Sequence, residues 1–453
     1  MERKLLKDEI YRFIEKYPLI TILLISLIFY IIWIWLPLGV LHSWNEAYYL
    51  NRVSYINNGG SYLDGRFDNP PLFVYILTAL SKITGVNIFV FRLFIMFCTI
   101  VTTLFIYKLG LLLKDKKTAI AASSLFAFFP MTVLFSKIIQ IEMFAIMLMI
   151  CSFYYTVLTV KQNQKYFLIS GLFLGLLVLT KFPNALVFIP IFYYMYHSKI
   201  QIKYYLLIII ETIIIPLPWI FYVLITKSSF FNQGVSSSKN FFGLGMMHTD
   251  APVYQIFLVV LAVLVFILLL IVYWRKKPSS LDEKTLFLFS LIFSSFFLLL
   301  PNHEYYLLTF FVPFFLLLSI IFLKGKKWKT LKKTIMVFMI ISIVLLIIRP
   351  VYEVNWEEPC NYVKKNYSKD INVYTSNLRV VEYYLSNNVT WLHPDKIENM
   401  SKQKSLIMFT CYDKINLENI NILEKIEKDF ILLKNFENKI YVYGSKNISG
   451  ENI

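Results

Sequence analysis

Long apolar runs alternate with short polar connections over most of this sequence. The runs lie between residues 18 and 349, and many are long enough to cross the ~30 Å hydrocarbon core of a bilayer as a helix. Helices are expected because lipid offers no hydrogen-bond partner to an unpaired backbone group. The pattern predicts eleven membrane spans, near residues 18–40, 88–112, 118–136, 142–160, 166–180, 184–197, 204–225, 253–274, 284–300, 305–323 and 334–348. Because two of these runs are short, a total of ten to twelve stays open.

Composition and charge indicate how the spans are oriented. Hydrophobic residues make up 58% of the chain, and the mean hydropathy is +0.61. A net charge of +17 would also fit a nucleic-acid partner, but the lysines and arginines cluster in alternate short connections, as the orientation of a membrane protein requires. We therefore expect no nucleic-acid binding. The basic amphipathic lead, residues 1–17, is predicted to lie in the cytoplasm of a multi-pass plasma-membrane protein, and an odd number of spans places residues 350–453 outside.

The most polar stretch of the predicted membrane domain, residues 18–349, follows the first span. It covers residues 41–71 and combines acids and arginines with several aromatic residues. Residues 72–84, between Pro71 and Gly85, are too short to cross the bilayer with ease. We predict that they form an interfacial helix on the outer face.

The last part of the chain, residues 350–453, has a different composition. Short strand-like runs near 371–375, 405–410, 429–433 and 439–444 alternate with helix-like stretches, which predicts a small extracytoplasmic α/β domain. Cys360 and Cys411 could form one disulfide there if the compartment is oxidising.

Ionisable residues near the predicted outer face are the candidates for chemistry. The acids Glu46, Asp68 and Glu142 gather on this side. Charged groups at membrane depth cost free energy, so their presence indicates a functional site. Acids beside cations suit a substrate that has both an anionic group and a nucleophile to deprotonate. Structural roles stay open for some of them: Glu142 could complement the dipole of its helix, and Lys137 and Lys181 could extend to the lipid headgroups.

Six features in a fixed order carry a resemblance to a known superfamily. They are Asn45-Glu46 before AYYLNRVSYI, Phe67-Asp68-Asn69-Pro70-Pro71-Leu72, Gly85 to Arg92 (GVNIFVFR), Glu142 at the start of a span, Leu179-Thr180-Lys181 after a glycine-containing helix, and His303-Glu304-Tyr305-Tyr306-Leu307-Leu308.

This order resembles the C-type glycosyltransferase (GT-C) superfamily, polytopic membrane enzymes that use polyprenyl-phosphate sugars. The similarity is to the branch of protein O-mannosyltransferases and lipid A aminoarabinose transferases. Two departures matter. Asn45 stands where the family usually has an acid, and Asn69 stands where the aminoarabinose branch often has a basic residue.

The resemblance implies transfer of a sugar from a polyprenyl-phosphate donor, with inversion, to a protein, lipid or glycan acceptor on the outer face. We expect catalytic roles for Glu46, Asp68 and Glu142, with Glu46 as the general base or as the acid that orients the acceptor, and the other two as supporting acids. The predicted donor-phosphate residues are Lys181, His303 and Arg92, and the predicted substrate-lining residues are Asn45, Tyr49, Arg66, Tyr305 and Tyr306. A monophosphate donor requires no cofactor, although a divalent cation held by Glu46, Asp68 and Glu142 stays open.

Two other classes of function compete with the transferase. A transporter or flippase of lipid-linked or anionic substrates would need a polar path across the membrane, whereas the inner halves of the spans carry almost no ionisable residues. A receptor-like or scaffolding protein would need no acids at membrane depth. The gathering of acids on one face favours the enzyme.

Overall fold

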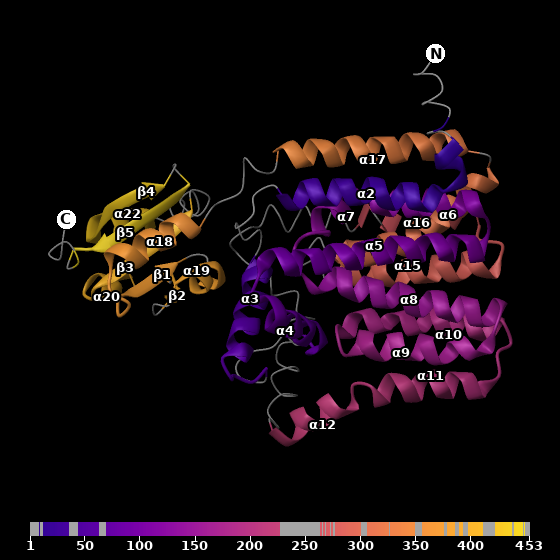
Figure 1. The fold of residues 1–453 in the computed structure, drawn as a ribbon, viewed down its shortest axis with the longest axis horizontal. Helices are drawn as coiled ribbons and strands as arrows, with labels where there is room; N and C mark the ends of the chain where they lie inside the picture. The colour runs from indigo at the N-terminus through magenta and orange to yellow at the C-terminus, as the bar shows by residue number, and fades with distance from the viewer. Residues whose placement is uncertain are drawn as a thin grey trace, which may run out of the picture. The chain divides into compact units, whose positions relative to one another are not determined.

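The computed structural model divides the chain into two compact units. The membrane unit contains Met1–Trp35, Gly60–Ile83 and Phe89–Ile347, and the C-terminal unit contains Leu36–Gly59, Thr84–Ile88 and Ile348–Ile453. The structure describes residues 9, 12–35, 44–62, 69–226, 263–264, 266–267, 269–271, 273–274, 277–299, 306–325, 327–348, 356–375, 378–385, 389–392, 397–410, 422–436, 439–446 and 448. Figure 1 shows the elements with the labels used below.

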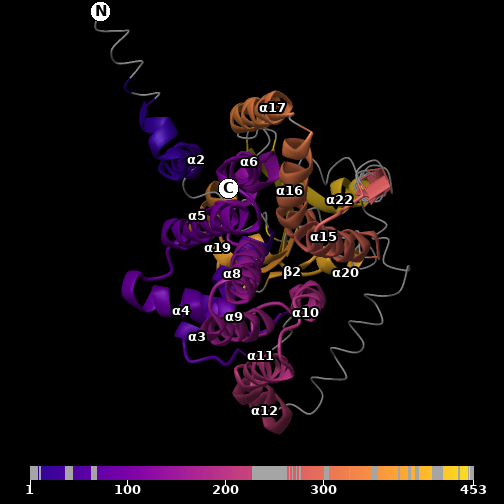
Figure 2. The same ribbon diagram turned by 90° about the vertical axis from the view of Figure 1, so that its right-hand side faces the viewer.

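The membrane unit is a layered array of helices, most of which run side by side, as the view along them in Figure 2 shows. Helix α8 packs against α9, α9 against α11, and α15 against α16. The described helices are α2 (Pro18–Trp35), α4 (Leu72–Thr84), α5 (Ile88–Leu113), α6 (Lys116–Ala127), α7 (Pro130–Phe135), α8 (Ile141–Lys161), η1 (Gln164–Tyr166), α9 (Phe167–Val178), η2 (Phe182–Val187), α10 (Phe188–His197), α11 (Ile202–Ile214), α12 (Leu217–Thr226), α15 (Leu281–Leu299), α16 (Tyr306–Lys324) and α17 (Trp328–Ile348).

The predicted helical membrane architecture is confirmed, but the predicted eleven spans are not. Among the described residues, two helices are long and apolar enough to cross a bilayer, Ile88–Leu113 and Ile141–Lys161. A third span results if Ile202–Ile214 and Leu217–Ile225, which meet at a bend of 41°, count as one. The predicted span at 253–274 lies largely outside the described residues.

Prolines explain why some predicted spans are interrupted. The apolar run at 118–136 divides into α6 and α7, and Pro130 opens α7 at a position where its missing N–H is not needed. Pro216 stands at the bend between α11 and α12 and removes a helical donor there. Helix α4 has the bounds predicted from Pro71 and Gly85.

Glycines allow two pairs of helices to approach closely. A Cβ added to Gly110 of α5 would stand 2.6 Å from the Cα of Ala119 in α6. A Cβ at Gly171 or Gly175 of α9 would overlap the side chains of Glu211 and Ile215 at the end of α11. A larger residue at these positions would force the neighbours to shift, because the backbone of α6 at Gly110, and side chains at the end of α11 at Gly171 and Gly175, occupy the space that its side chain needs.

Polar contacts join the helix ends that lie opposite Glu142. The Nζ atom of Lys161 at the end of α8 is 2.8 Å from Oδ2 of Asp282 in α15, and the hydroxyl of Tyr194 in α10 donates to Oδ1 of the same carboxylate at 2.9 Å. Lys324 of α16 pairs with Glu283 of α15. These contacts tie four helices together at one end of the unit.

The C-terminal unit contains the predicted α/β domain. Its five-stranded sheet has the order β2-β1-β3-β5-β4, with β1 parallel to β2 and β3, and β5 antiparallel to β3 and β4. The core gathers Ile407 and Phe409 of the central strand with residues of the covering helices. The elements are β1 (Asn372–Thr375), β2 (Val389–Trp391), β3 (Ser405–Thr410), β4 (Phe430–Phe436), β5 (Ile440–Ser445), α18 (Glu357–Asn366), α19 (Leu378–Tyr384), α20 (Ile397–Ser401) and α22 (Ile422–Asp429).

Helix α3 (Trp44–Asn57), from the predicted outer loop, belongs to this second unit and packs against α19. Cys360 is buried in α18 as a free thiol. Its predicted partner, Cys411, lies outside the described residues.

Candidate functional site

A buried ion pair forms the centre of the candidate site in the membrane unit. The Nζ atom of Lys181 lies 2.7 Å from Oε1 of Glu142, and the two side chains are only 4% and 6% exposed. The other carboxylate oxygen of Glu142 is buried and has no hydrogen-bond partner among the described residues. Burial of two charges is costly, so a pair of this kind persists where neighbouring structure or function demands it.

The pair exists because α8 and α9 pack as antiparallel neighbours. Glu142 lies in the first turn of α8, where a carboxylate suits the positive end of the helix dipole. Helix α9 returns along α8 and ends in a turn in which Lys181 becomes the first, extended residue before η2. The packing of the two helices thus lets the Lys181 ammonium donate to a carboxylate 39 residues earlier in the sequence.

Two further predicted motifs lie near the residues of the pair. The N–H of Leu72, the first residue of α4, donates to the carbonyl of Leu179 at 3.2 Å, so the Pro-Pro-Leu motif contacts the Leu-Thr-Lys motif. The rings of Phe73, Phe94 and Phe144 form a cluster, with centroids 5.7 to 6.4 Å apart. These rings join the starts of α4, α5 and α8.

Arg92, two residues before Phe94, is the largest fully buried side chain in the described part of the chain. The structure therefore brings together the surroundings of Arg92, Glu142 and Lys181, three of the predicted site residues. The guanidinium and the ammonium can donate charge-assisted hydrogen bonds to an anion, and the carboxylate can hold the ammonium in place.

Sequence reasoning gave too little weight to the segment between α7 and α8. Residues 136–140 are not helical, yet all five are buried. Lys137 is fully buried, and so it does not extend to the lipid headgroups as one interpretation of the sequence suggested. Gln140 is 3% exposed, and its Oε1 atom has no hydrogen-bond partner among the described residues. The sequence did contain a signal, because polar residues interrupt an apolar run at this point. Non-helical backbone at membrane depth is tolerated only where protein surrounds it or water reaches it, so these residues could have been expected to lie inside the protein.

Glu211 is a second residue that sequence reasoning missed. It lies in α11, and its carboxylate faces Gly171 of α9, so the spans do carry an acid away from the outer ends. In the sequence it follows three isoleucines and precedes Thr212, in an otherwise apolar run.

Three of the predicted residues, Asn45, Glu46 and Tyr49, lie in the C-terminal unit. Glu46, in the first turn of α3, is fully buried, and Tyr49, one turn later, is 4% exposed. Asn45 is part of α3, and Tyr306 begins α16, but their side chains are outside the described set. Asp68, Arg66, His303 and Tyr305 also lie outside the described residues.

No group of three His, Cys, Asp or Glu side chains suited to a metal ion occurs among the described residues. The predicted alternative of a divalent cation depends on Asp68, which is outside that set, and so it stays a prediction.

Comparisons with known proteins agree with the helical arrangement. The family model of dolichyl-phosphate-mannose-protein mannosyltransferases matches residues 68–222, the stretch that contains Arg92, Glu142 and Lys181. No curated protein matches the chain significantly.

Several solved structures have a similar fold. ArnT from Cupriavidus metallidurans bound to undecaprenyl phosphate superposes with a TM-score of 0.62 at 10% identity, over 94% of this chain and 97% of that one. The oligosaccharyltransferase of Archaeoglobus fulgidus in the apo form gives 0.55 at 12% identity, over 87% of this chain and 70% of that one. A complex of the same archaeal enzyme, AglB, with an inhibitory peptide and a dolichol-phosphate gives 0.51 at 12% identity, over 89% and 70%.

The predicted resemblance is thus confirmed at the level of the superfamily. The family match at residues 68–222 and the fold make the chain similar to the C-type (GT-C) polytopic membrane glycosyltransferases.

Proposed function

We infer that this protein transfers a sugar from a polyprenyl-phosphate donor to an acceptor on the extracytoplasmic face of the membrane. The buried pair of Glu142 and Lys181, in the same unit as the buried Arg92, is the observation that carries the proposal, since these residues supply cations in a water-poor setting. The structural relatives support a lipid-phosphate donor, because one was solved with undecaprenyl phosphate and another with a dolichol-phosphate.

The reaction is a single displacement at the anomeric carbon of the sugar. The bond from that carbon to the phosphate oxygen breaks, and both electrons leave with the polyprenyl phosphate. A new bond forms to the acceptor oxygen, whose proton passes to a carboxylate. Attack from the face opposite the leaving group inverts the configuration.

Glu46 is the proposed general base. It is fully buried on α3, and a positioned carboxylate can take the proton of an acceptor hydroxyl in the transition state. Asp68 is proposed as a supporting acid, and Tyr49, Asn45, Arg66, Tyr305 and Tyr306 as substrate-lining residues on the same resemblance.

Lys181 and Arg92 are proposed to bind the donor phosphate, with His303 as a third group. Negative charge develops on the phosphate as it leaves, and preorganised cations that stabilise this charge lower the activation free energy of the transfer. Glu142 then acts as a positioning residue: it holds the Lys181 ammonium, which can donate up to three hydrogen bonds and so can serve both a carboxylate and a phosphate.

A donor-release assay tests the proposal. The purified protein in nanodiscs is given radiolabelled polyprenyl-phosphate sugars, and free polyprenyl phosphate is measured for the wild type, Glu46→Gln and a control, Glu358→Gln, which changes an exposed acid of α18 in the same unit. We expect the wild type and the control to release it, and Glu46→Gln to lose at least about 100-fold in rate, as for removal of a general base. Equal release by all three proteins would transfer the role of base to another acid.

A further inference from the structure

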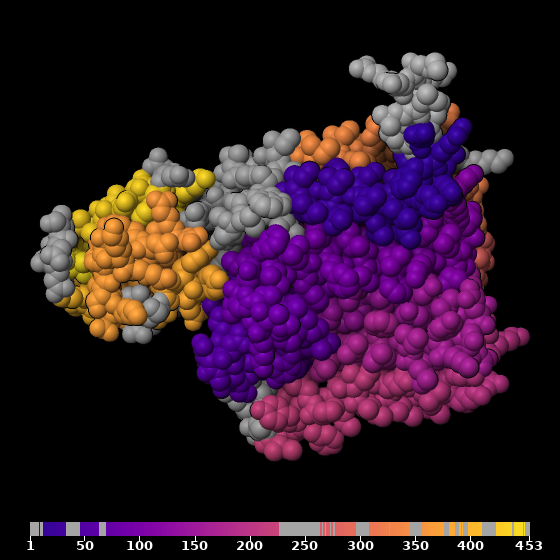
Figure 3. All heavy atoms as spheres, viewed as in Figure 1, coloured from indigo at the N-terminus to yellow at the C-terminus, as the bar shows by residue number. Residues whose placement is uncertain are grey.

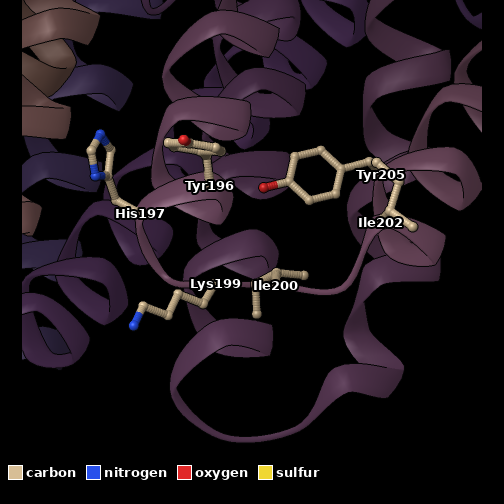
Figure 4. Close-up of a pocket in the computed structure, with 6 residues that line it drawn as sticks. All are labelled: Tyr196, His197, Lys199, Ile200, Ile202 and Tyr205. Atoms are coloured by element: carbon tan, nitrogen blue, oxygen red, sulfur yellow. The ribbon is translucent and has the colours of Figure 1, made fainter.

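A pocket lies at the turn between α10 and α11, and the proposed transfer reaction has no use for it. Its volume is about 540 Å³. Figure 4 shows two tyrosines on its walls, with an imidazole and an ammonium at the same turn. The lining residues are Tyr196, His197, Lys199, Ile200, Ile202 and Tyr205.

This pocket is at the end of the membrane unit opposite the ion pair. Helix α8 (Ile141–Lys161) has 21 residues, a length of about 30 Å, with Glu142 near its start and Lys161 at its end. Helix α9 returns to the level of Lys181, and α10 leads away again to His197. The ring centroid of Tyr204, at the start of α11, lies 4.8 Å from that of Phe167, at the start of α9, and the two rings are tilted by 33°. A ligand in the pocket is therefore about one bilayer thickness from the proposed reaction.

The charge around the pocket is positive. Between Glu142 and Glu211 the sequence contains no acid, whereas the connections at this end carry Lys165, His197, Lys199 and Lys203. Asp282 and Glu283 of α15 lie at the same end, but each is paired with a lysine, Lys161 and Lys324, so cations remain in excess. The backbone adds to this field. The N–H groups of residues 198–200 satisfy carbonyls at the end of α10, but the N-cap of α11 makes no side-chain hydrogen bond to the first turn. Uncapped N–H groups at a helix start favour an anion.

The backbone of Lys199 belongs to the turn that ends α10. Its φ angle is +55°, the left-handed region in which helices commonly end and in which glycine is the favoured residue. The N–H of the next residue, Ile200, donates to the carbonyl of Met195 and closes this turn. Lys199 is exposed at the pocket, where its ammonium can meet a ligand.

An apolar stripe begins at the same place. Ile202, Leu206, Ile210 and Ile213 lie on one face of α11 and are 71%, 52%, 49% and 53% exposed. In Figure 3, α11 and α12 form the lower edge of the membrane unit. A ligand that has an anionic head and a long apolar chain would satisfy the pocket and the stripe at once.

We propose that this pocket binds the phosphate headgroup of an anionic glycerophospholipid, with an acyl chain along the exposed face of α11. The ammonium of Lys199 and the hydroxyls of Tyr196 and Tyr205 contact the phosphate, and Ile200 and Ile202 contact the glycerol and upper chain. The lipid belongs to the leaflet opposite the reaction and serves as a structural or regulatory ligand, not as a substrate.

Native mass spectrometry of the full-length protein tests this. The protein is released from micelles that contain equal amounts of dioleoyl phosphatidylglycerol and dioleoyl phosphatidylcholine, and the retained lipids are counted. We expect the wild type to retain phosphatidylglycerol preferentially. The Lys199→Gly variant removes the charge and relieves the backbone strain, so it should fold at least as well and retain about fivefold less of the anionic lipid, the loss for one cation at a charged lipid surface.

Two matched variants serve as controls. Lys199→Arg keeps the charge and should retain the anionic lipid, and Lys165→Gln, which changes an exposed lysine of the same membrane face outside the pocket, should behave as the wild type. Equal retention by Lys199→Gly and the wild type, or equal retention of both lipids, would overturn the proposal. Displacement of phosphatidylglycerol by millimolar inorganic phosphate would also overturn it, because the site would then recognise a free anion.

Discussion

The ion pair of Glu142 and Lys181 gives the sharpest quantitative prediction. At 2.7 Å, and at an effective dielectric constant of about 20, the Coulomb attraction of the pair is about 6 kcal/mol. Desolvation of the two ions costs several kcal/mol each, so the net contribution of the pair to the free energy of unfolding is small. Removal of one partner is different, since the other charge then stays buried without compensation.

We therefore expect Lys181→Met to lower the free energy of unfolding by about 3 to 5 kcal/mol, and Glu142→Gln by a similar amount. The double variant should lie within about 1 kcal/mol of the wild type, because neither charge remains to be desolvated. The measurement is an SDS titration in mixed micelles, followed by tryptophan fluorescence.

Lys161→Met is a matched control. Lys161 forms an ion pair of nearly the same length, 2.8 Å, but its side chain is 31% exposed. We expect a loss of at most about 1 kcal/mol, because water screens the remaining charge. Equal losses for Lys161→Met and Lys181→Met would refute the reasoning from burial. If the double variant folds and also turns over the donor at the wild-type rate, the pair is structural and not part of the site.

Two other predictions concern packing and a buried thiol. Gly110→Ala should lower the free energy of unfolding by about 1 to 3 kcal/mol, because the new methyl group meets the backbone of Ala119, whereas Gly325→Ala, whose nearest neighbour would be at 3.6 Å, should change it by less than about 0.5 kcal/mol in the same titration. Burial raises the pKa of the Cys360 thiol to about 12. The folded protein then keeps a proton that the unfolded chain loses above about pH 9, so stability should fall by about 1.4 kcal/mol per pH unit above that pH relative to Cys360→Ala, as urea titrations of both proteins between pH 8 and 10.5 would show. A constant difference between the two proteins over that range would contradict the burial of this thiol.

The sequence predicted those elements whose boundaries are set by local chemistry. Helix α4 begins after Pro71 and ends before Gly85 because both residues disfavour a helical continuation. The four predicted strands of the C-terminal domain were found because each is a run of β-branched and aromatic residues. Strand β2 was missed, since three residues carry too little pattern and parallel pairing with β1 is what makes them a strand.

Features that depend on long-range packing could not be predicted. The bond between Glu142 and Lys181 requires α8 and α9 to lie antiparallel at one particular register. The burial of Lys137 depends on a segment that leaves the helical conformation between α7 and α8, whereas hydropathy treats the same residues as the polar end of a span. Likewise, the contact between α3 and α19 joins residues more than 300 positions apart, so part of the segment that the sequence predicted to be a loop of the membrane domain groups with the C-terminal domain.

The most direct measurement follows the sugar itself. Purified wild-type protein in nanodiscs would receive polyprenyl phosphate carrying a radiolabelled sugar, together with a delipidated extract of cell-envelope acceptors, and the label would be followed into the acceptor fraction. We expect label in the acceptor fraction and an equal amount of free polyprenyl phosphate, both lost in Glu46→Gln. Several polyprenyl-phosphate sugars would be tried with protein that the SDS titration shows to be folded. If none of them binds or reacts, the proposed sugar transfer is wrong, and transport of a lipid-linked substrate becomes the function to test.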